Sequence, residues 1–238
     1  MSVFTYHLVK TDIITALKMI LAPPSPKNTP GLIHAECMTA MTLGSPVFST
    51  SRILVRQVAL FAKWENERAI DIFLENTKTG KILATGWHTR LTLVRQWGKF
   101  TEFGVPHENI ELHTLNVQAV VVVTIARMKL LEIPRFIHWG RPVEKLVRDH
   151  PGTTLSLASI RLPRTVSTFS IWKSQEEMAG MVYGHSDVPH PKRHINAMYE
   201  RDRKDFHIEF TTMRFKATSE FGTWNGKSNI IPNLNKLQ

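Results

Sequence analysis

Two segments of the chain repeat one pattern of apolar and polar positions. They read RQVALFAKWENERAIDIF at 56–73 and TVSTFSIWKSQEEMAGMV at 165–182. In each, an alternating pattern typical of a strand ends at a tryptophan, and a helical pattern follows. The matching apolar positions, separated by a constant 108 residues, are Val58 and Val166, Phe61 and Phe169, Trp64 and Trp172, and Ile70 and Met178. This self-similarity predicts a duplicated structural unit.

Both repeated helices have residues suited to their first turn. Asn66 can cap the first helix, because its side-chain oxygen can accept from a free backbone N–H. Ser174 precedes the second helix, and Glu177 follows three residues later, which is a capping box.

The rest of each unit extends the pattern to the order βαββαβ. In the first unit we expect strands near 3–9, 32–39, 52–64 and 89–97, with helices at 12–21 and after Asn66. In the second, the apolar run AVVVVTIARMKL begins a series of strands completed at 153–161, 165–172 and 207–217. Its helices are expected at 135–148, with a break or kink near Pro142, after Ser174, and at 194–203. The predicted fold is α+β, with two tandem ferredoxin-like repeats.

These elements divide the chain into four parts. Residues 1–98 form the N-terminal repeat, 99–117 the connection, 118–227 the C-terminal repeat and 228–238 a polar tail expected to be mobile. The stretch at 22–31 is rich in proline and is expected to turn.

Membrane-spanning segments are not expected. The longest apolar run, around Val120–Val123, is far shorter than the roughly 20 residues that cross a bilayer. Residues 13–22 resemble the core of a signal peptide, but Asp12 precedes them and Lys18 interrupts them. We therefore interpret this segment as an amphipathic helix.

The net charge of +10 favours acidic partners, which include nucleic acid, anionic lipid headgroups and the propionates of a haem. The segment HPKRHINAMYERDRKDFH, at 190–207, mixes basic and aromatic residues, but its acidic residues equally suit a solvated helix face. Neither central strand carries the aromatic motif of RNA-recognition modules, so nucleic acid is not the expected partner.

Common catalytic signatures are absent from the sequence. It contains no phosphate-binding glycine-rich loop, no paired-cysteine motif and no nucleophile elbow. The single cysteine, Cys37, suits a reducing compartment and is either a small buried hydrophobe or a thiolate ligand of haem. Eleven histidines make metal or haem ligation worth considering. The alternative is that these histidines are surface or turn residues with no ligand.

The second half carries a longer pattern of motifs. It comprises STFSIWKSQEEM, then HINAMYERDRKDF, then EFTTMRFKATSEFGTWNG. This pattern resembles the C-terminal half of the spheroidene monooxygenases, a group of haem-dependent carotenoid oxygenases. The matching positions are Ser170, Trp172, Met178, His194, Ala197, Phe206, Glu209, Arg214, Phe215, Gly222, Trp224 and Gly226. The chain departs from the family in its longer loop GHSDVPHPKRH and in Phe206, where the family often has Trp.

The resemblance implies a dimeric α/β-barrel fold, as in chlorite dismutases and dye-decolorising peroxidases, with haem b as cofactor. His194 is then the expected iron ligand, with His190 and His185 as substitutes, because His194 alone keeps the spacing to Ala197 and Phe206. Arg214 and Arg127 lie on expected strands, where each can point into the site to pair with a propionate or to polarise bound oxygen. Each can equally form a structural ion pair or lie at the surface.

The implied function is a haem-dependent monooxygenase that inserts oxygen from O₂ into an apolar substrate such as a carotenoid. Its expected partners are that substrate and an external electron donor, with peripheral membrane contact and a homo-oligomer as further expectations. A cytoplasmic, membrane-associated location would suit them. Two alternatives stay open: a non-catalytic protein that binds haem or a lipophile, and a cofactor-free monooxygenase of the small α/β-barrel kind.

Overall fold

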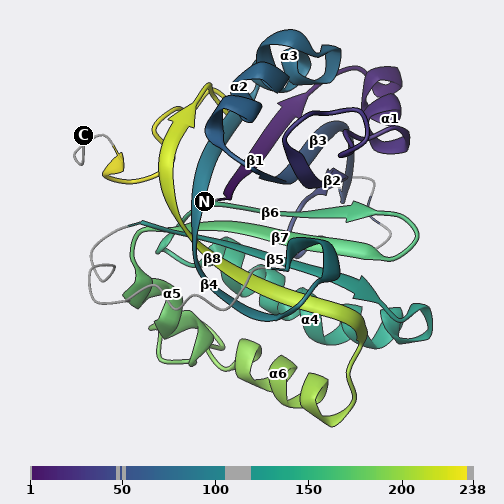
Figure 1. Ribbon diagram of the computed structural model, residues 1–238. Coiled ribbons are helices and arrows are strands. Elements are labelled where there is room, and N and C mark those ends of the chain that lie inside the picture. The colour runs from purple at the N-terminus through teal and green to yellow at the C-terminus, as the bar shows by residue number, and fades with distance from the viewer. Residues whose placement is uncertain (1, 47–48, 50–51, 105–118, 235–238) are drawn as a thin grey trace.

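Strands from both repeats close into one barrel, with helices on the outside (Figure 1). The computed structural model describes residues 2–46, 49, 52–104 and 119–234. In these ranges the strands are β1 (Val3–Lys10), β2 (Leu32–Met41), β3 (Ile53–Trp64), β4 (Trp87–Lys99), β5 (Val120–Met128), β6 (Thr153–Arg161), β7 (Thr165–Trp172) and β8 (His207–Phe221). The α-helices are α1 (Ile13–Leu21), α2 (Glu67–Asn76), α3 (Lys78–Ala84), α4 (Ile133–Asp149), α5 (Gln175–Val182) and α6 (Arg193–Arg203). Two short 3₁₀ helices are η1 (Thr101–Phe103) and η3 (Leu130–Glu132).

The barrel order, β1-β3-β2-β6-β7-β5-β8-β4, contains the same arrangement twice. The N-terminal half runs β4-β1-β3-β2 and the C-terminal half runs β8-β5-β7-β6, all antiparallel. The halves join along β4 and β8, from His88↔Phe221 to Lys99↔Phe210, and along a short seam between β2 and β6. The prediction of an α+β fold with two ferredoxin-like repeats in a barrel is confirmed.

The repeated segments occupy equivalent places in the two halves. Asn66 accepts from the Ala69 N–H at 3.0 Å at the start of α2, and Ser174 accepts from the Glu177 N–H at 3.2 Å at the start of α5. Trp64 and Trp172 are both buried, and each indole N–H donates to a hydroxyl, 2.9 Å away, on a strand of its own half. The two tryptophans anchor strand to helix in both copies.

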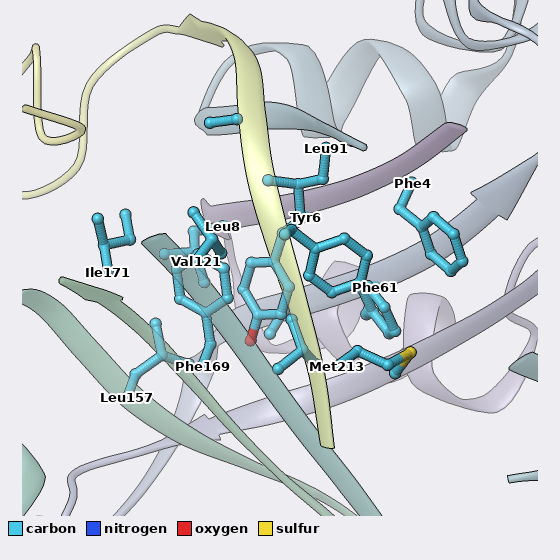
Figure 2. Packing of buried hydrophobic residues seen from close by; sticks show 14 of the residues in the cluster. Phe4, Tyr6, Leu8, Phe61, Leu91, Val121, Leu157, Phe169, Ile171 and Met213 are labelled. Carbon is cyan, nitrogen blue, oxygen red and sulfur yellow. The ribbon is translucent and has the colours of Figure 1, made fainter. Parts of the chain in front are cut away.

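The barrel interior is a packed core. Figure 2 shows aromatic and aliphatic side chains from both halves pointing toward one another, among them Phe4, Tyr6 and Phe169. The rings of Tyr6 and Phe169 stack with centroids 3.8 Å apart. Phe100 and Phe103, which flank and end η1, and Trp224, Ile230 and Ile231 complete this cluster. These buried side chains pack against one another as one hydrophobic core.

Two of the helices differ from expectation. Helix α4 continues through Pro142, whose fixed φ suits a helix although it removes one backbone donor. A further helix, α3, follows α2 directly, capped by the Thr77 hydroxyl, which accepts from the Gly80 N–H at 2.9 Å. A side chain at Gly80 would overlap the Phe73 carbonyl, so this glycine is needed for close packing and hid the helix in the sequence pattern.

The expected mobile tail is also different where it is described. The backbone N–H groups of Ile230 and Ile231 donate to the Glu220 carboxylate at 2.8 and 3.0 Å, and both side chains are buried. Residues 235–238, and residues 105–117 of the expected connection, lie outside the described ranges. None of the helices in the described part of the chain is long and apolar enough to cross a bilayer.

Candidate functional site

The two halves differ on the faces that their helices cover. On β3, the outward side chains Val58, Leu60, Ala62 and Trp64 are all fully buried. Their counterparts on β7 are Val166, Thr168, Ser170 and Trp172, and the first two of these are partly exposed. Helices α1–α3 and α4–α6 lie on opposite sides of the barrel (Figure 1). The apolar row that β3 presents to its helices is therefore interrupted on β7.

Three hydroxyl groups lie at the centre of this second face, where the first half has the buried side chains Leu60, His7 and His88. Thr212, Thr124 and Thr168 are aligned across β8, β5 and β7. The Thr124 and Thr212 hydroxyls lie 3.1 Å apart, and all three residues are partly exposed. We refer to Val122, Thr124, Thr168, Thr212 and Arg214 as the C-terminal face. Polar side chains on a sheet face that helices cover are usually replaced by apolar ones. A solvent-accessible polar patch at this place is therefore a candidate binding site.

Arg214 lies on this face with an incomplete set of partners. One guanidinium N–H donates to the Gln175 amide oxygen of α5 at 3.2 Å, and the guanidinium carbon lies 4.9 Å from the centre of the Trp97 ring. Its Nε is buried without a hydrogen-bond partner, and no carboxylate among the described residues pairs with it. Burial, and then the charge of Arg95, lowers the pKa of Arg214.

The equivalent arginine of the first half shows what has changed. Arg90 pairs with Thr5 of β1 as Arg214 pairs with Val122 of β5. Arg90 forms ion pairs with two carboxylates of α2, those of Glu67, at 2.9 Å, and Asp71. At the repeat distance of 108 residues these become Gln175 and Ala179. The Arg214 charge is therefore free to pair with an anionic group from outside the protein.

His194 lies in the first turn of α6 with one ring nitrogen fixed. Its Nδ1 is 3.1 Å from the Val182 carbonyl oxygen, which can only accept, so Nδ1 carries the proton. Burial lowers the pKa of His194, so the ring is neutral near pH 7. Its Nε2 has no hydrogen-bond partner among the described residues and is not sealed from solvent. Such a nitrogen is a free lone-pair donor with a set orientation.

His194 and Arg214 each form a hydrogen bond with helix α5. Helix α6 returns into β8 after three residues, and the Arg201 guanidinium lies 5.1 Å from the Phe210 ring of β8. His194 stands two turns before Arg201, on the same face of the helix. His194 therefore lies at the C-terminal end of α5, and Arg214 at its N-terminal end.

The substitute ligands and the second arginine lie elsewhere. His185 and His190 are exposed in the loop before α6, where His190 lines a surface cavity of about 340 Å³. Arg127 faces the other side of its strand and forms ion pairs with Glu102 and Glu209, with its guanidinium 4.3 Å from the Phe100 ring. Burial lowers the pKa of Arg127, but these carboxylates outweigh it and the net shift is upward. Arg127 belongs to an ion cluster near η1, apart from the C-terminal face.

Cys37 is placed as a small buried hydrophobe. Its side chain lies in the apolar layer between the N-terminal sheet and its helices. Burial raises the pKa of the thiol to about 12, so a thiolate is disfavoured there.

Sequence inspection missed Gln175, Thr124, Thr168 and Thr212. The internal repeat contained the signal, since Gln175 stands opposite Glu67 and Thr168 opposite Leu60. Comparing the copies for differences, rather than for agreement, identifies these positions.

Comparison with known proteins supports the fold. No protein-family model matches the chain, and no curated protein matches it. An aldoxime dehydratase in complex with butyraldoxime is 7% identical over 93% of this chain and 80% of its own, with a TM-score of 0.56. A second aldoxime dehydratase is 9% identical over 96% and 87%, also at 0.56. A heme-degrading enzyme from Listeria monocytogenes is 12% identical over 88% and 98%, at 0.28. The two dehydratases establish a shared fold, while the last score is too low to establish one.

Proposed function

We propose that the chain is a haem-dependent monooxygenase that acts on an apolar substrate, with its haem between the C-terminal face and helices α5 and α6. The observation that carries this proposal is the state of His194. Its Nδ1 donates to a carbonyl 3.1 Å away, and its Nε2 is left without a partner. A hydrogen bond of this kind holds the ring of an iron-binding histidine in one orientation and leaves its other nitrogen for the metal.

Residues of the C-terminal half have the chemistry that a haem site requires. A haem needs a nitrogen ligand, cations for its propionates and apolar surface for its macrocycle. His194 supplies the nitrogen, and Arg214 a cation without a carboxylate partner. Val122, Val166 and Phe210 supply partly exposed apolar surface on the outward side of the sheet. Each requirement is met by residues of one half.

When bound, a haem supplies the chemistry of O₂ activation, with electrons from an external donor. The protein groups have separate tasks. The Val182 carbonyl keeps the His194 ring in one orientation and tautomer. Gln175 orients the Arg214 guanidinium, which would bind a propionate carboxylate of the haem. The Thr124 and Thr212 hydroxyls can donate to polar atoms of a ligand. A carotenoid is the first substrate class to test, because the sequence resembles the spheroidene monooxygenases.

The test is an absorption spectrum of the full chain expressed with ample haem. We expect a Soret band that His194→Ala removes or shifts and that His185→Ala and His190→Ala, on the exposed loop, leave unchanged. A wild-type protein without a Soret band would overturn the proposal in favour of cofactor-free oxidation or simple lipophile binding. An unchanged spectrum in His194→Ala would refute the ligand assignment.

A further inference from the structure

Helix α1 is apolar on the side that faces solvent. Ile14 and Leu21 are 66% and 81% exposed, and Ile13 and Leu17 are 50% and 52% exposed. The spacing of these four residues places them on one face of the helix. Ala16 and Met19, on the opposite face, are buried against the N-terminal sheet. The exposed face is therefore surplus to the needs of folding.

A neighbouring helix shows that this exposure is particular to α1. On α2, the exposed residues are mainly charged, as expected for a helix that covers a sheet. They include Glu67, Arg68 and Glu75, with Ile72 as one aliphatic neighbour. Four large aliphatic side chains on a nine-residue helix form a contiguous patch, and such patches mark interaction surfaces.

The charges around this patch are almost all positive. Lys18 lies on the exposed face itself, and Lys27 is exposed in the loop that follows α1. Arg56 reaches the start of the helix, where its Nε donates to the Thr11 carbonyl at 3.2 Å. The one acidic side chain within 10–31, Asp12, is engaged as the N-cap and accepts from the Thr15 N–H at 2.9 Å. The partner of this surface therefore has apolar and anionic groups side by side.

We propose that α1 docks on an anionic membrane surface, with its four aliphatic side chains in the interface and its basic neighbours at the headgroups. A helix with an apolar face and flanking lysines is suited to lie in the plane of such an interface without crossing it. A second copy of the chain fits less well. A symmetric pairing through this face would bring the two Lys18 side chains, and their basic neighbours, close together.

Membrane binding would have an apolar contribution from the aliphatic side chains and an electrostatic contribution from the basic ones, and each can be removed by substitution. Replacing Ile14 and Leu21 together by serine removes most of the apolar contribution and lowers the partition coefficient at least about tenfold. Lys18→Glu lowers it at least about fivefold, since a basic residue near an anionic surface contributes about that factor.

The experiment is co-sedimentation of the full chain with phosphatidylcholine vesicles, with and without about one third phosphatidylglycerol. We expect binding to the anionic vesicles alone, weakened by salt. The matched control is Ile72→Ser with Leu131→Ser, which changes two exposed aliphatic residues outside α1 and leaves binding unchanged. Circular dichroism checks that each variant is folded.

Two results would overturn the proposal. One is wild-type binding by the Ile14→Ser, Leu21→Ser variant. The other is a wild-type protein that does not bind anionic vesicles and sediments as a dimer, while the Ile14→Ser, Leu21→Ser variant sediments as a monomer. That result would assign the exposed face of α1 to self-association. Neither measurement requires haem, so the outcome is independent of the proposed function.

Discussion

Arg90 and Arg214 occupy equivalent positions but have different partners. Arg90 is neutralised by Glu67 and Asp71, whereas Arg214 has the Gln175 amide. A guanidinium that keeps its charge in a partly buried place without a counter-ion costs stability, and such costs are usually retained where binding requires them.

Gln175→Glu tests this directly. The new carboxylate would stand where Glu67 stands in the first half and would pair with Arg214. We expect the free energy of unfolding to rise by about 0.5–1 kcal/mol, since the pair is partly exposed. If Arg214 binds an anionic group of the ligand, haem affinity in a titration falls about tenfold. Glu67→Gln is the control and should lower stability without affecting haem affinity.

A second residue-scale feature is the buried pair His7 and His88. Their rings stack with centroids 5.0 Å apart, and neither ring nitrogen of His7 has a hydrogen-bond partner among the described residues. Burial, and then Arg90, lowers the pKa of His88 from 6.5 to about 4. Burial, followed by His88 and Arg90, lowers the pKa of His7 well below 6.5. Both imidazoles are therefore neutral in the folded protein at neutral pH.

These shifts make stability dependent on pH. Below pH 6.5 the unfolded chain protonates both histidines, while the folded chain keeps His88 neutral down to about 4. The free energy of unfolding is thus highest above pH 6.5 and decreases as the pH is lowered from 6.5 to about 4. His88 alone contributes a decrease on the order of 3 kcal/mol. Denaturant titrations across the window measure the slope. His88→Thr, the residue at the equivalent position of the second half, should flatten it, and His138→Thr, on the exposed side of α4, should not.

At the scale of elements, η1 is held against the barrel by ion pairs. Arg127 of β5 pairs with Glu102 of η1 and Glu209 of β8, and Glu209 also accepts from the Thr101 N–H at 3.1 Å. The Lys63 ammonium donates to the Gly104 carbonyl at 2.8 Å. These contacts keep Phe100 and Phe103 in the core.

Removal of Arg127 should therefore destabilise the fold. Arg127→Ala leaves the Glu102 and Glu209 carboxylates close together without a cation, and we expect a loss of about 2–4 kcal/mol in equilibrium unfolding. Arg203→Ala removes an exposed arginine from Glu200, which keeps its ion pair with Arg135, and should cost less than about 1 kcal/mol. Equal losses in the two variants would show that the cluster does not hold η1.

Sequence prediction succeeded where local chemistry decides the structure. The caps Asn66 and Ser174 and the alternation before Trp64 and Trp172 are properties of neighbouring residues, so they were visible. Helix α3 was hidden because Gly80 is required by contact with Phe73 in the preceding helix. The side to which Arg127 points was open because alternation gives two faces, and only packing decides which is inside. The role of Gln175 could be recognised only by comparing it with Glu67, its counterpart in the N-terminal half.

At the scale of the whole molecule, the two halves should differ in dynamics. The N-terminal half has one continuous layer between sheet and helices, whereas apolar side chains outside the barrel in the C-terminal half form several small clusters. Fewer buried contacts allow easier local opening.

Hydrogen exchange on the intact protein measures this difference. We expect backbone amides of α5 and α6 to exchange at least about tenfold faster than those of α2, because less apolar burial opposes their opening. Added haem should slow the exchange of α5 and α6 and leave α2 unchanged. Uniform protection of all three helices would contradict the assignment of the site to the second half.

The duplication has a consequence for stoichiometry. Two identical subunits related by a twofold axis must carry two identical sites, and neither can change alone. Here the copies are joined in one chain, so Arg90 could keep its carboxylates while Arg214 lost them. The pseudo-twofold symmetry is broken at the residues that we propose bind the ligand. A titration of this protein should therefore saturate at a single equivalent of ligand per chain, although its barrel contains the same unit twice.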